Sequence, residues 1–455
     1  MENDFRTLKT SLTSVIHKEC LEDVLVKINK IVINVNHLRT HVLQFSKAYL
    51  LHLTGYKIPL PIINREYFQC IIRTLTVSKN KRKPFTKSAV MYESILQFYN
   101  LHYKSLIYYL EKSIDITGIQ NVIRYMIIDD ITNYENNIKQ RYFNFIDKFI
   151  NATWRKNEMI QLIKKKFTDK SILKEKLKKF YKELSNMKND LLNLHKIDYK
   201  KTSSKIYHEW IITSTNKIIP NKKFKKDSVY YDIECSPQDY LPCMFYMNML
   251  CEKYEYKLLN VVPLKTSIIP GHIMLDTQNI IDLFENCKNR KLYNSDIKMF
   301  KELVWSHFFK TNKKIFNSST HHFNGSIRTD GFSISILQQN KVPLKKFKKR
   351  SDVYINEITK KEQAELKNKT FIAIDPNKGD LIYCASGSKE TNDFKTFRYT
   401  NNQRSKETKK RKYRDILSNE KYKERDLIDV ISKETELSKY SKKTMNEILF
   451  KEYIK

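Results

Sequence analysis

The sequence has little glycine, and its few glycines are unevenly placed. Only 7 of the 455 residues are glycine, and four of them fall between Gly325 and Gly387. Because glycine marks turns and bulges, most of the β-structure is predicted in this late part of the chain. No apolar run approaches the length of about 18 residues that a membrane span needs, so none is expected. The residues after Met1 also lack a signal-peptide pattern.

Metal-binding and hydrolase signatures are missing as well. Cys235, Cys243 and Cys251 are spaced eight residues apart, which matches no common zinc spacing. We therefore predict no zinc site and free thiols in a reducing, intracellular compartment. The adjacent pair His321 and His322 has no Cys or His at ligand spacing, which favours a polar loop over a metal site. No phosphate-binding loop of the Walker type is present.

Acidic residues are few relative to basic ones. The 84 Lys and Arg residues against 50 Asp and Glu residues give a formal net charge of +34. Such a charge repels itself unless a polyanion neutralises it, and nucleic acid is the usual partner. Codon bias toward Lys, Asn, Ile, Tyr and Phe is the alternative, but it does not explain the excess of basic over acidic residues. We predict a nucleic-acid-binding protein.

The first half of the chain has helical periodicity. Apolar residues from Leu21 to Phe45 follow the i, i+3, i+4 spacing of an amphipathic helix. Residues 160–194 predict a long basic helix or helical pair, for which a solvated charged face is the favoured interpretation. From about Lys217, prolines divide shorter segments, and the alternating residues Phe332 to Leu337 predict a strand. Residues 345–350 form a predicted basic linker.

Asp375 is the leading candidate for a catalytic residue. It ends an apolar stretch, residues 370–375, that predicts a strand, and a tight turn leads from it into a second strand ending at Ala385. Residues 394–399 predict a third strand, and residues 401–455 are charged and helical in pattern. A carboxylate fixed at a strand end suits Mg²⁺ binding, as in two-metal nucleases. The alternative is a simple Asp-Pro turn. Asp375 is thus predicted as both catalytic residue and metal ligand.

Basic and polar residues follow the third predicted strand. Phosphate contacts are expected from side chains of this kind. The residues predicted to bind nucleic acid here are Arg398, Gln403, Arg404, Lys409, Lys410, Arg411, Lys412 and Arg414. A nuclear import signal over residues 406–414 is an alternative explanation for part of this set.

Three ordered motifs resemble the Fanzor proteins. They are residues 324–336, residues 371–379 and residues 397–404, and the resemblance covers roughly residues 320–415. Fanzor proteins are eukaryotic and giant-virus relatives of the transposon-encoded TnpB nucleases, which are RNA-guided DNA endonucleases. The ordered trio is far more specific than any one motif.

The resemblance implies an α+β multidomain fold. It implies a helical, recognition-lobe-like region over residues 1–216 and a β-containing, wedge-like region over residues 217–345. Residues 346–455 would form the N-terminal portion of an RNase H-like (RuvC) α/β domain. Arg328, in the second region, corresponds to a guide-RNA contact, and Asp375 to the first RuvC carboxylate.

The resemblance also implies partners and a cofactor: guide RNA, target DNA and Mg²⁺. The later RuvC carboxylates of the family would lie beyond Lys455, so we expect a chain truncated at its C-terminus and inactive by itself. Two alternatives stay open, a non-catalytic regulator that binds guide RNA or DNA, and the product of a decayed transposon-associated reading frame. The expected location is the nucleus or viral factory of a eukaryotic host cell.

Overall fold

The computed structural model shows two compact units. It describes residues 5–76, 88–106, 118–222, 224, 226–266, 269–342, 358–360, 364, 366, 371–375, 379–387, 394–423 and 425–455. Unit 1 comprises residues 1–343 and 440–455, and unit 2 comprises residues 344–439. Unit 1 therefore runs across the predicted boundary at residue 217, whereas unit 2 begins beside the predicted boundary at residue 345. The predicted linker, residues 345–350, and the turn residues 376–378 lie outside the described residues.

Unit 1 is mainly helical. Its long helices are α1 (Leu21–Gly55), α4 (Gln120–Thr153) and α6 (Lys170–Asn193). The shorter helices are α2 (Arg65–Leu75), α3 (Ala89–Phe98), α5 (Lys156–Lys166), α7 (His208–Ile218), α8 (Val229–Cys235), α9 (Leu241–Lys253), α10 (Thr277–Phe284), α11 (Cys287–Ser295), α12 (Ile297–Phe308) and α17 (Glu447–Ile454). The predicted helix over residues 21–45 is confirmed and continues further than its periodic pattern.

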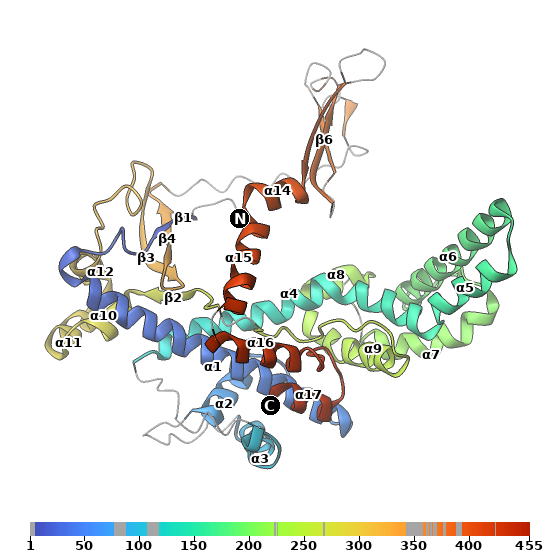
Figure 1. Ribbon diagram of the computed structural model, residues 1–455, viewed down its shortest axis with the longest axis horizontal. Coiled ribbons are helices and arrows are strands. Elements are labelled where there is room, and N and C mark those ends of the chain that lie inside the picture. The colour runs from blue at the N-terminus through green and yellow to red at the C-terminus, as the bar shows by residue number, and fades with distance from the viewer. Residues whose placement is uncertain are drawn as a thin grey trace. The chain divides into compact units, whose positions relative to one another are not determined.

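Helix α1 is the centre of the core of unit 1. Its second half, from Leu38 to Leu53, is buried on almost every side, including the polar residues His41, Ser46 and Lys47. Helices α2, α4 and α17 pack against it. Helix α4 buries one side chain about every three or four residues from Val122 to Ile150. It links the sheet at β2 to helix α6 at the far end of this unit (Figure 1).

A four-stranded antiparallel sheet lies at one end of unit 1, beside α10, α11 and α12 (Figure 1). Its strands, in spatial order, are β1 (Phe5–Ser11), β4 (Ser333–Asn340), β3 (His321–Thr329) and β2 (Ile273–Asp276). A bulge interrupts β3 between Phe323 and Ile327, where Gly325 has a φ of +90°, a conformation that favours glycine. The strand predicted at residues 332–337 is confirmed, but the edge strand β1 was not predicted.

The polar loop predicted at His321 and His322 is wrong. Both residues open strand β3, where His321 pairs with Asn340 and His322 with Gln339. Their partners belong to the neighbouring strand, so backbone hydrogen bonding decides their conformation more than their own polarity does. The predicted turn at Asp330 is confirmed. The Asp330 carboxylate accepts hydrogen bonds from the backbone N–H of Phe332 at 3.0 Å and of Ser333 at 2.8 Å.

Unit 2 contains the three strands that were predicted after residue 370. They are β5 (Ile372–Asp375), β6 (Asp380–Ser386) and β7 (Lys395–Thr400), paired antiparallel in chain order. Helices α14 (Asn401–Glu407), α15 (Lys410–Lys423) and α16 (Arg425–Leu437) follow. With two small antiparallel sheets and many helices, the chain belongs to the α+β class, as predicted. The six cysteines whose side chains are described form no disulfide with one another. No helix of the described part is long and apolar enough to cross a membrane.

Candidate nucleic-acid interface

Neighbouring rows of the β5-β6-β7 sheet differ in polarity. Residues directly opposite each other in an antiparallel ladder project to the same side. Ile374 pairs with Cys384 and this with Phe397, which makes an apolar row. Asp375 pairs with Tyr383 and this with Arg398, one step along the strands. The strand register therefore places two predicted site residues, Asp375 and Arg398, on the same face of the sheet.

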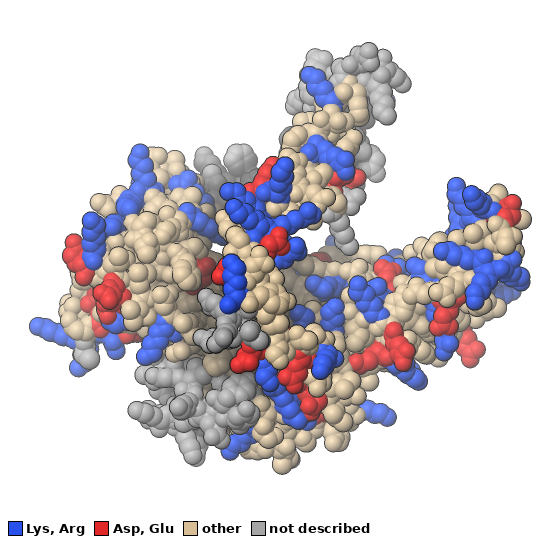
Figure 2. Space-filling model, in the orientation of Figure 1, with Lys and Arg blue, Asp and Glu red and all other residues tan. Residues whose placement is uncertain are grey.

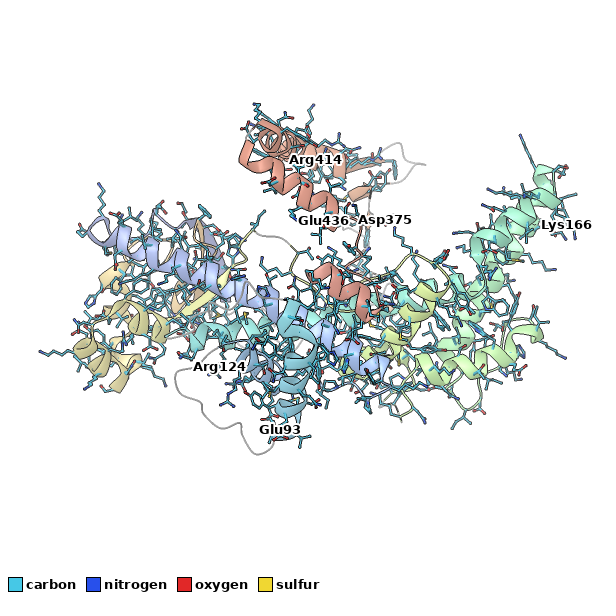
Figure 3. All side chains as sticks on the ribbon, turned by 60° about the horizontal axis from the view of Figure 1, so that its bottom comes forward. Glu93, Arg124, Lys166, Asp375, Arg414 and Glu436 are labelled. Carbon is cyan, nitrogen blue, oxygen red and sulfur yellow. The ribbon has the colours of Figure 1, made fainter. Side chains whose placement is uncertain are left out.

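Asp375 lacks the neighbours that a metal centre needs. The residue is exposed at the end of β5 (Figure 3). The next carboxylate in the chain, Asp380, is engaged by Arg398, with 2.7 Å between Arg398 Nε and Asp380 Oδ1. In the described part of the chain no three His, Cys, Asp or Glu residues come together as a metal-binding group. Because two-metal chemistry needs several anionic oxygens, the described residues offer Mg²⁺ at most a single free carboxylate here.

The same ion pair changes the interpretation of Arg398. A phosphate approaching its guanidinium must compete with the Asp380 carboxylate, which already neutralises the charge. Arg398 is 62% exposed and Asp380 26% exposed at the side chain, so solvent screens the pair and its strength is modest. Arg398 is thus accessible, but it is not a free cation.

The helical elbow between α14 and α15 brings four of the predicted residues together. Arg404, Lys410, Arg411 and Arg414 line an open hollow of about 750 Å³ within unit 2. The chain turns at Lys409, which has a φ of 52°, in the left-handed region that non-glycine residues seldom adopt. We call this feature the basic elbow. Figure 2 shows lysine and arginine side chains gathered over it, and Figure 3 labels Arg414 on α15.

Local hydrogen bonds fix the start of the basic elbow. Thr400 caps α14 by accepting a hydrogen bond from Gln403 N–H at 3.0 Å, as N-cap residues do. The Gln403 side chain donates to Glu407 at 3.1 Å, and Tyr399 O–H donates to the same carboxylate at 2.7 Å. The Tyr399–Glu407 bond therefore holds α14 against the end of β7, and one N–H of the Gln403 amide is used to orient the same carboxylate.

Most cations of the basic elbow have no acidic partner among the described residues. Arg411 donates to Asn402 Oδ1 at 2.9 Å, which orients its guanidinium without neutralising it. Arg414 approaches the adjacent Asp415 at 3.6 Å while 76% of its side chain stays exposed. No ion pair in the described residues engages the remaining cations, which are Arg404, Lys409, Lys410 and Lys412.

An aromatic ring that the sequence analysis did not select lies in the same hollow. Tyr413 lines it between the cations and is 62% exposed. An exposed aromatic ring beside several cations is the arrangement with which proteins stack a base while holding the flanking phosphates. The local pattern Lys412-Tyr413-Arg414 was the signal in the sequence that could have identified it.

Arg328 belongs to unit 1, whereas the other predicted site residues belong to unit 2. It projects from β3 and makes a two-pronged ion pair with Asp129 of α4, at 3.2 Å from Nη1 to Oδ2 and 3.1 Å from Nη2 to Oδ1. Such planar pairing is the strongest geometry for an arginine and a carboxylate. Arg328 therefore joins the sheet to α4, and any guide-RNA contact would use the exposed half of its side chain.

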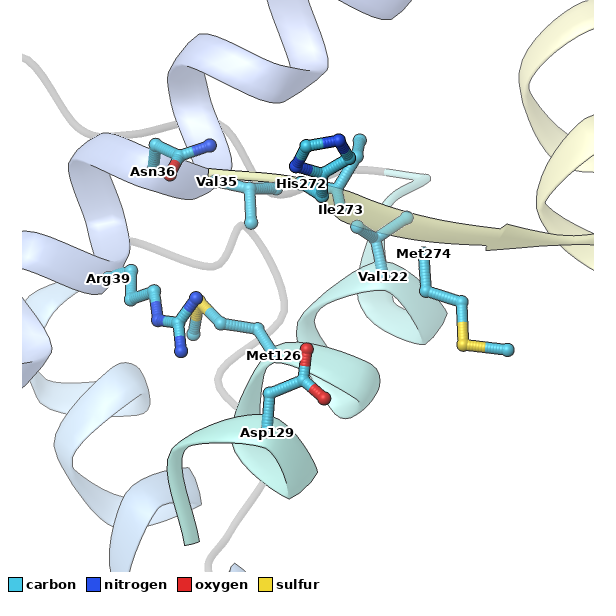
Figure 4. Close-up of a pocket in the computed structure, with 9 residues that line it drawn as sticks. All are labelled: Val35, Asn36, Arg39, Val122, Met126, Asp129, His272, Ile273 and Met274. Atoms are coloured by element: carbon cyan, nitrogen blue, oxygen red, sulfur yellow. The ribbon is translucent and has the colours of Figure 1, made fainter. Parts of the chain in front are cut away.

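The cavity beneath that ion pair is too small for a ligand. It lies between α1, α4 and β2, and Arg39, Asp129 and His272 are among the residues that line it (Figure 4). Its volume of about 10 Å³ is near the minimum for one water molecule. Neighbouring Asp130 is buried and accepts a hydrogen bond from Arg39 at 2.7 Å. Burial raises the pKa of Asp130 to about 6, and the charge of Arg39 opposes that rise. These groups form a structural network.

Comparison with known proteins gives one match. Residues 273–340 match a family model described as a domain of unknown function, DUF8286. The matched segment runs from β2 to β4 and includes α10, α11, α12 and Arg328. A search of curated proteins found no match to this chain. The match covers less than a fifth of the chain and assigns no chemistry to it.

Proposed function

We propose that this protein binds nucleic acid through the basic elbow, where cations hold phosphates and Tyr413 stacks on a base. The observation that carries the proposal is the set of exposed cations around one hollow, of which only Arg414 has an acidic partner among the described residues, the adjacent Asp415 at 3.6 Å. Paired cations such as Arg328 contribute little to polyanion binding, because their charge is already neutralised. Single-stranded segments of a structured RNA fit this arrangement best, since their bases are free to stack.

We further propose that the protein derives from RNA-guided DNA endonucleases of the Fanzor and TnpB type. The three motifs support this origin, and so does an antiparallel sheet with Asp375 at the end of its first strand. Guide RNA is then the natural ligand of the basic elbow, and target DNA the second partner. Binding without efficient cleavage is the proposed activity, since Asp375 has no second free carboxylate beside it among the described residues.

A non-catalytic regulator that retains guide RNA is the second candidate. The Arg398–Asp380 ion pair favours it, because Asp380, the next carboxylate after Asp375 in the chain, is engaged by Arg398 and is not a free metal ligand. The decayed reading frame is less well supported, since unit 1 has one continuous core in which the largest side chains, such as Trp305 and Phe45, are buried.

Charge-matched variants of the full-length chain test the proposal. In the elbow variant, Arg404, Lys410, Arg411 and Arg414 are replaced by Gln. Its control replaces four exposed lysines of unit 2 outside the hollow, Lys395, Lys423, Lys433 and Lys439, by Gln. Binding of a single-stranded RNA is measured by fluorescence anisotropy at several salt concentrations.

Wild-type protein is expected to bind with about micromolar or better affinity that falls steeply with salt. The elbow variant should lower the slope of log K against log salt by about 2 to 3, at about 0.7 per phosphate for single strands. Tyr413→Leu should weaken binding by about 1 to 3 kcal/mol with an unchanged slope. Equal losses in the elbow variant and its control would refute a specific role of the hollow. Failed nuclear import with intact RNA binding would identify residues 406–414 as a targeting signal instead.

A further inference from the structure

Helices α5 and α6 form an arm at the end of unit 1 opposite the sheet (Figure 1). No residue of α5 is buried, and in α6 the first buried residue is Leu184. Phe167 and Phe180 are only partly covered. The free part of the arm, residues 156–182, therefore has a minimal core and exposes most of its surface. A segment with so little burial contributes little to the stability of the fold.

Lysines form a stripe that winds along this arm. Lys170, Lys174, Lys178 and Lys182 follow one another at intervals of four residues on α6, and all four are exposed. Successive members of such a row lie on the same side of a helix about 6 Å apart, so the stripe is about 18 Å long. Residues 156–182 contain ten lysines and only three acidic residues. Figure 2 shows the lysines gathered at the end of the arm, where Figure 3 labels Lys166.

The acidic residues of the arm do not neutralise this charge. The Asp169 carboxylate caps α6 and accepts hydrogen bonds from the N–H groups of Ser171 and Ile172, both at 2.9 Å. Glu158 pairs with Arg155 at 3.4 Å. No ion pair in the described residues engages any of the ten lysines. Like charges four residues apart destabilise a helix, so the stripe opposes the stability of the arm until a polyanion binds.

Ammonium groups lie over two of the aromatic rings of the arm. Lys166 and Lys176 lie over Phe167, at 5.9 and 5.6 Å from the ring centre, and Lys156 lies over Tyr181 at 5.1 Å. Each of these two rings therefore has an ammonium group beside it, which orders the lysines. Tyr181 is 44% exposed, less than Tyr413 of the basic elbow, which is 62% exposed.

We propose that the arm is a second, separate nucleic-acid contact and that it binds the phosphate backbone of a duplex. A regular row of exposed cations fits the regular line of phosphates along a duplex. The rings of Phe167 and Tyr181 beside it already contact ammonium groups, whereas the more exposed Tyr413 of the basic elbow suits the stacking of single-stranded bases. The contact recognises shape and charge, without reading base sequence. The arm belongs to unit 1 and the basic elbow to unit 2, so each can be tested while the other stays intact.

The test compares duplex and single-stranded binding by three variants of the full-length protein. In the stripe variant, Lys170, Lys174, Lys178 and Lys182 become Gln, which preserves helix propensity. The charge-matched control replaces Lys253, Lys257, Lys288 and Lys291, which are exposed lysines elsewhere in unit 1. A rescue variant has Arg at the four stripe positions and keeps the charge. Circular dichroism verifies that all three retain the helical content of the wild type.

The stripe variant is expected to bind duplex RNA and DNA at least about tenfold more weakly at low salt, with a salt slope lower by about 3 to 4. Its single-strand affinity should change much less, and the Arg variant should bind duplex like the wild type. The elbow variant should show the opposite pattern. It should lose single-strand binding, while the salt slope of its duplex binding should stay as in the wild type. If the elbow variant fails to lose RNA binding, the proposed function falls while the arm proposal stands.

Three results would overturn the arm proposal. Unchanged duplex binding by the stripe variant would show that the lysines are only a solvated face. Equal losses in the stripe variant and its control would show that net charge alone acts. Loss of binding to phosphatidylserine vesicles, with duplex binding intact, would identify an anionic membrane as the partner.

Discussion

Lys47 offers a quantitative test of how the last residues of the chain are held. It lies in the buried half of α1 and is only 3% exposed. Its Nζ donates a hydrogen bond to the backbone carbonyl of Lys442 and lies 4.3 Å from the centre of the Phe450 ring. Burial lowers the pKa of Lys47 to about 7, and the charge of Glu252 opposes that fall. An amine in the core thus contacts the segment, residues 440–455, that returns to unit 1.

The lowered pKa of Lys47 makes the free energy of unfolding depend on pH. Between pH 7 and the ordinary lysine value of 10.5, the unfolded chain binds a proton that the folded chain lacks, so the free energy of unfolding rises with pH. Below pH 7 both states are protonated and the contribution is constant. At about 1.4 kcal/mol per pH unit, the full penalty is about 4 to 5 kcal/mol, of which about 2 kcal/mol is relieved between pH 7 and pH 9.

Lys47→Met should therefore be more stable than the wild type at pH 7. The variant removes the burial penalty of Lys47, but it leaves the Lys442 carbonyl without its donor, which costs about 1 to 2 kcal/mol. The net gain in the free energy of unfolding is therefore about 2 to 3 kcal/mol. Urea unfolding is followed by tryptophan fluorescence, which reports on unit 1 because Trp154, Trp210 and Trp305 all belong to it. The advantage of the variant should shrink by about 2 kcal/mol from pH 7 to pH 9.

The control is Lys30→Met, an exposed position of the same helix, which should shift stability by less than about 0.5 kcal/mol at either pH. Parallel pH profiles for wild type and Lys47→Met would refute the reasoning, because they would show that Lys47 is charged and well solvated in the folded protein. A destabilised Lys47→Met at pH 7 would show that the Lys442 contact outweighs the burial penalty.

Three further predictions address the sheet, the turn and Asp375. A double-mutant cycle of Arg328→Met and Asp129→Asn should give a coupling energy of about 0.5 to 1 kcal/mol, measured by urea unfolding. Gly331→Ala should destabilise by about 1 to 3 kcal/mol, because Gly331 has a φ of +93° and a Cβ would lie 2.2 Å from Asn29; Gly55→Ala, with open space around it, should cost nothing measurable. With Mg²⁺, the chain should cleave DNA at no more than a trace level, and Asp375→Ala should leave that level unchanged. Guide-dependent cleavage that disappears with Asp375→Ala would contradict the proposed activity.

The sequence predicted elements whose signals are local. Helix α1 has a long apolar period, and strands β5, β6 and β7 are short apolar or alternating runs bounded by turn residues. The turn at Asp330 depends on contacts within three residues. Strand β1 has weak alternation of its own, and its register is set by β4, more than 320 residues away, where Phe5 pairs with Gln339. Long-range pairing of that kind leaves no pattern within a local window.

The residues of the candidate site show the same limit. Basic residue types could be identified from the sequence, but their ion pairs could not. Arg328 meets Asp129 only because α4 packs beside the sheet, and Arg398 meets Asp380 only in the register of β6 and β7. The hollow of the basic elbow in turn depends on the backbone turn at Lys409. Composition predicts a polyanion partner, whereas only the fold distinguishes neutralised cations from free ones.

This distinction determines what net charge can explain. A net charge of +34 attracts any polyanion at long range, but counterion release on binding counts only the cations that contact phosphates. Cations already paired with a carboxylate add little to the salt slope. The basic elbow and the arm concentrate largely unpaired cations on two helical features with different surroundings. Tyr413 lines the hollow of the basic elbow and is 62% exposed, whereas Tyr181 of the arm lies under Lys156 and is 44% exposed. The slope of log K against log salt is therefore expected to depend on the basic elbow for single-stranded ligands and on the arm for duplex ligands. A single slope for all ligands, lowered equally by both variants, would mean that the net charge acts without a defined site.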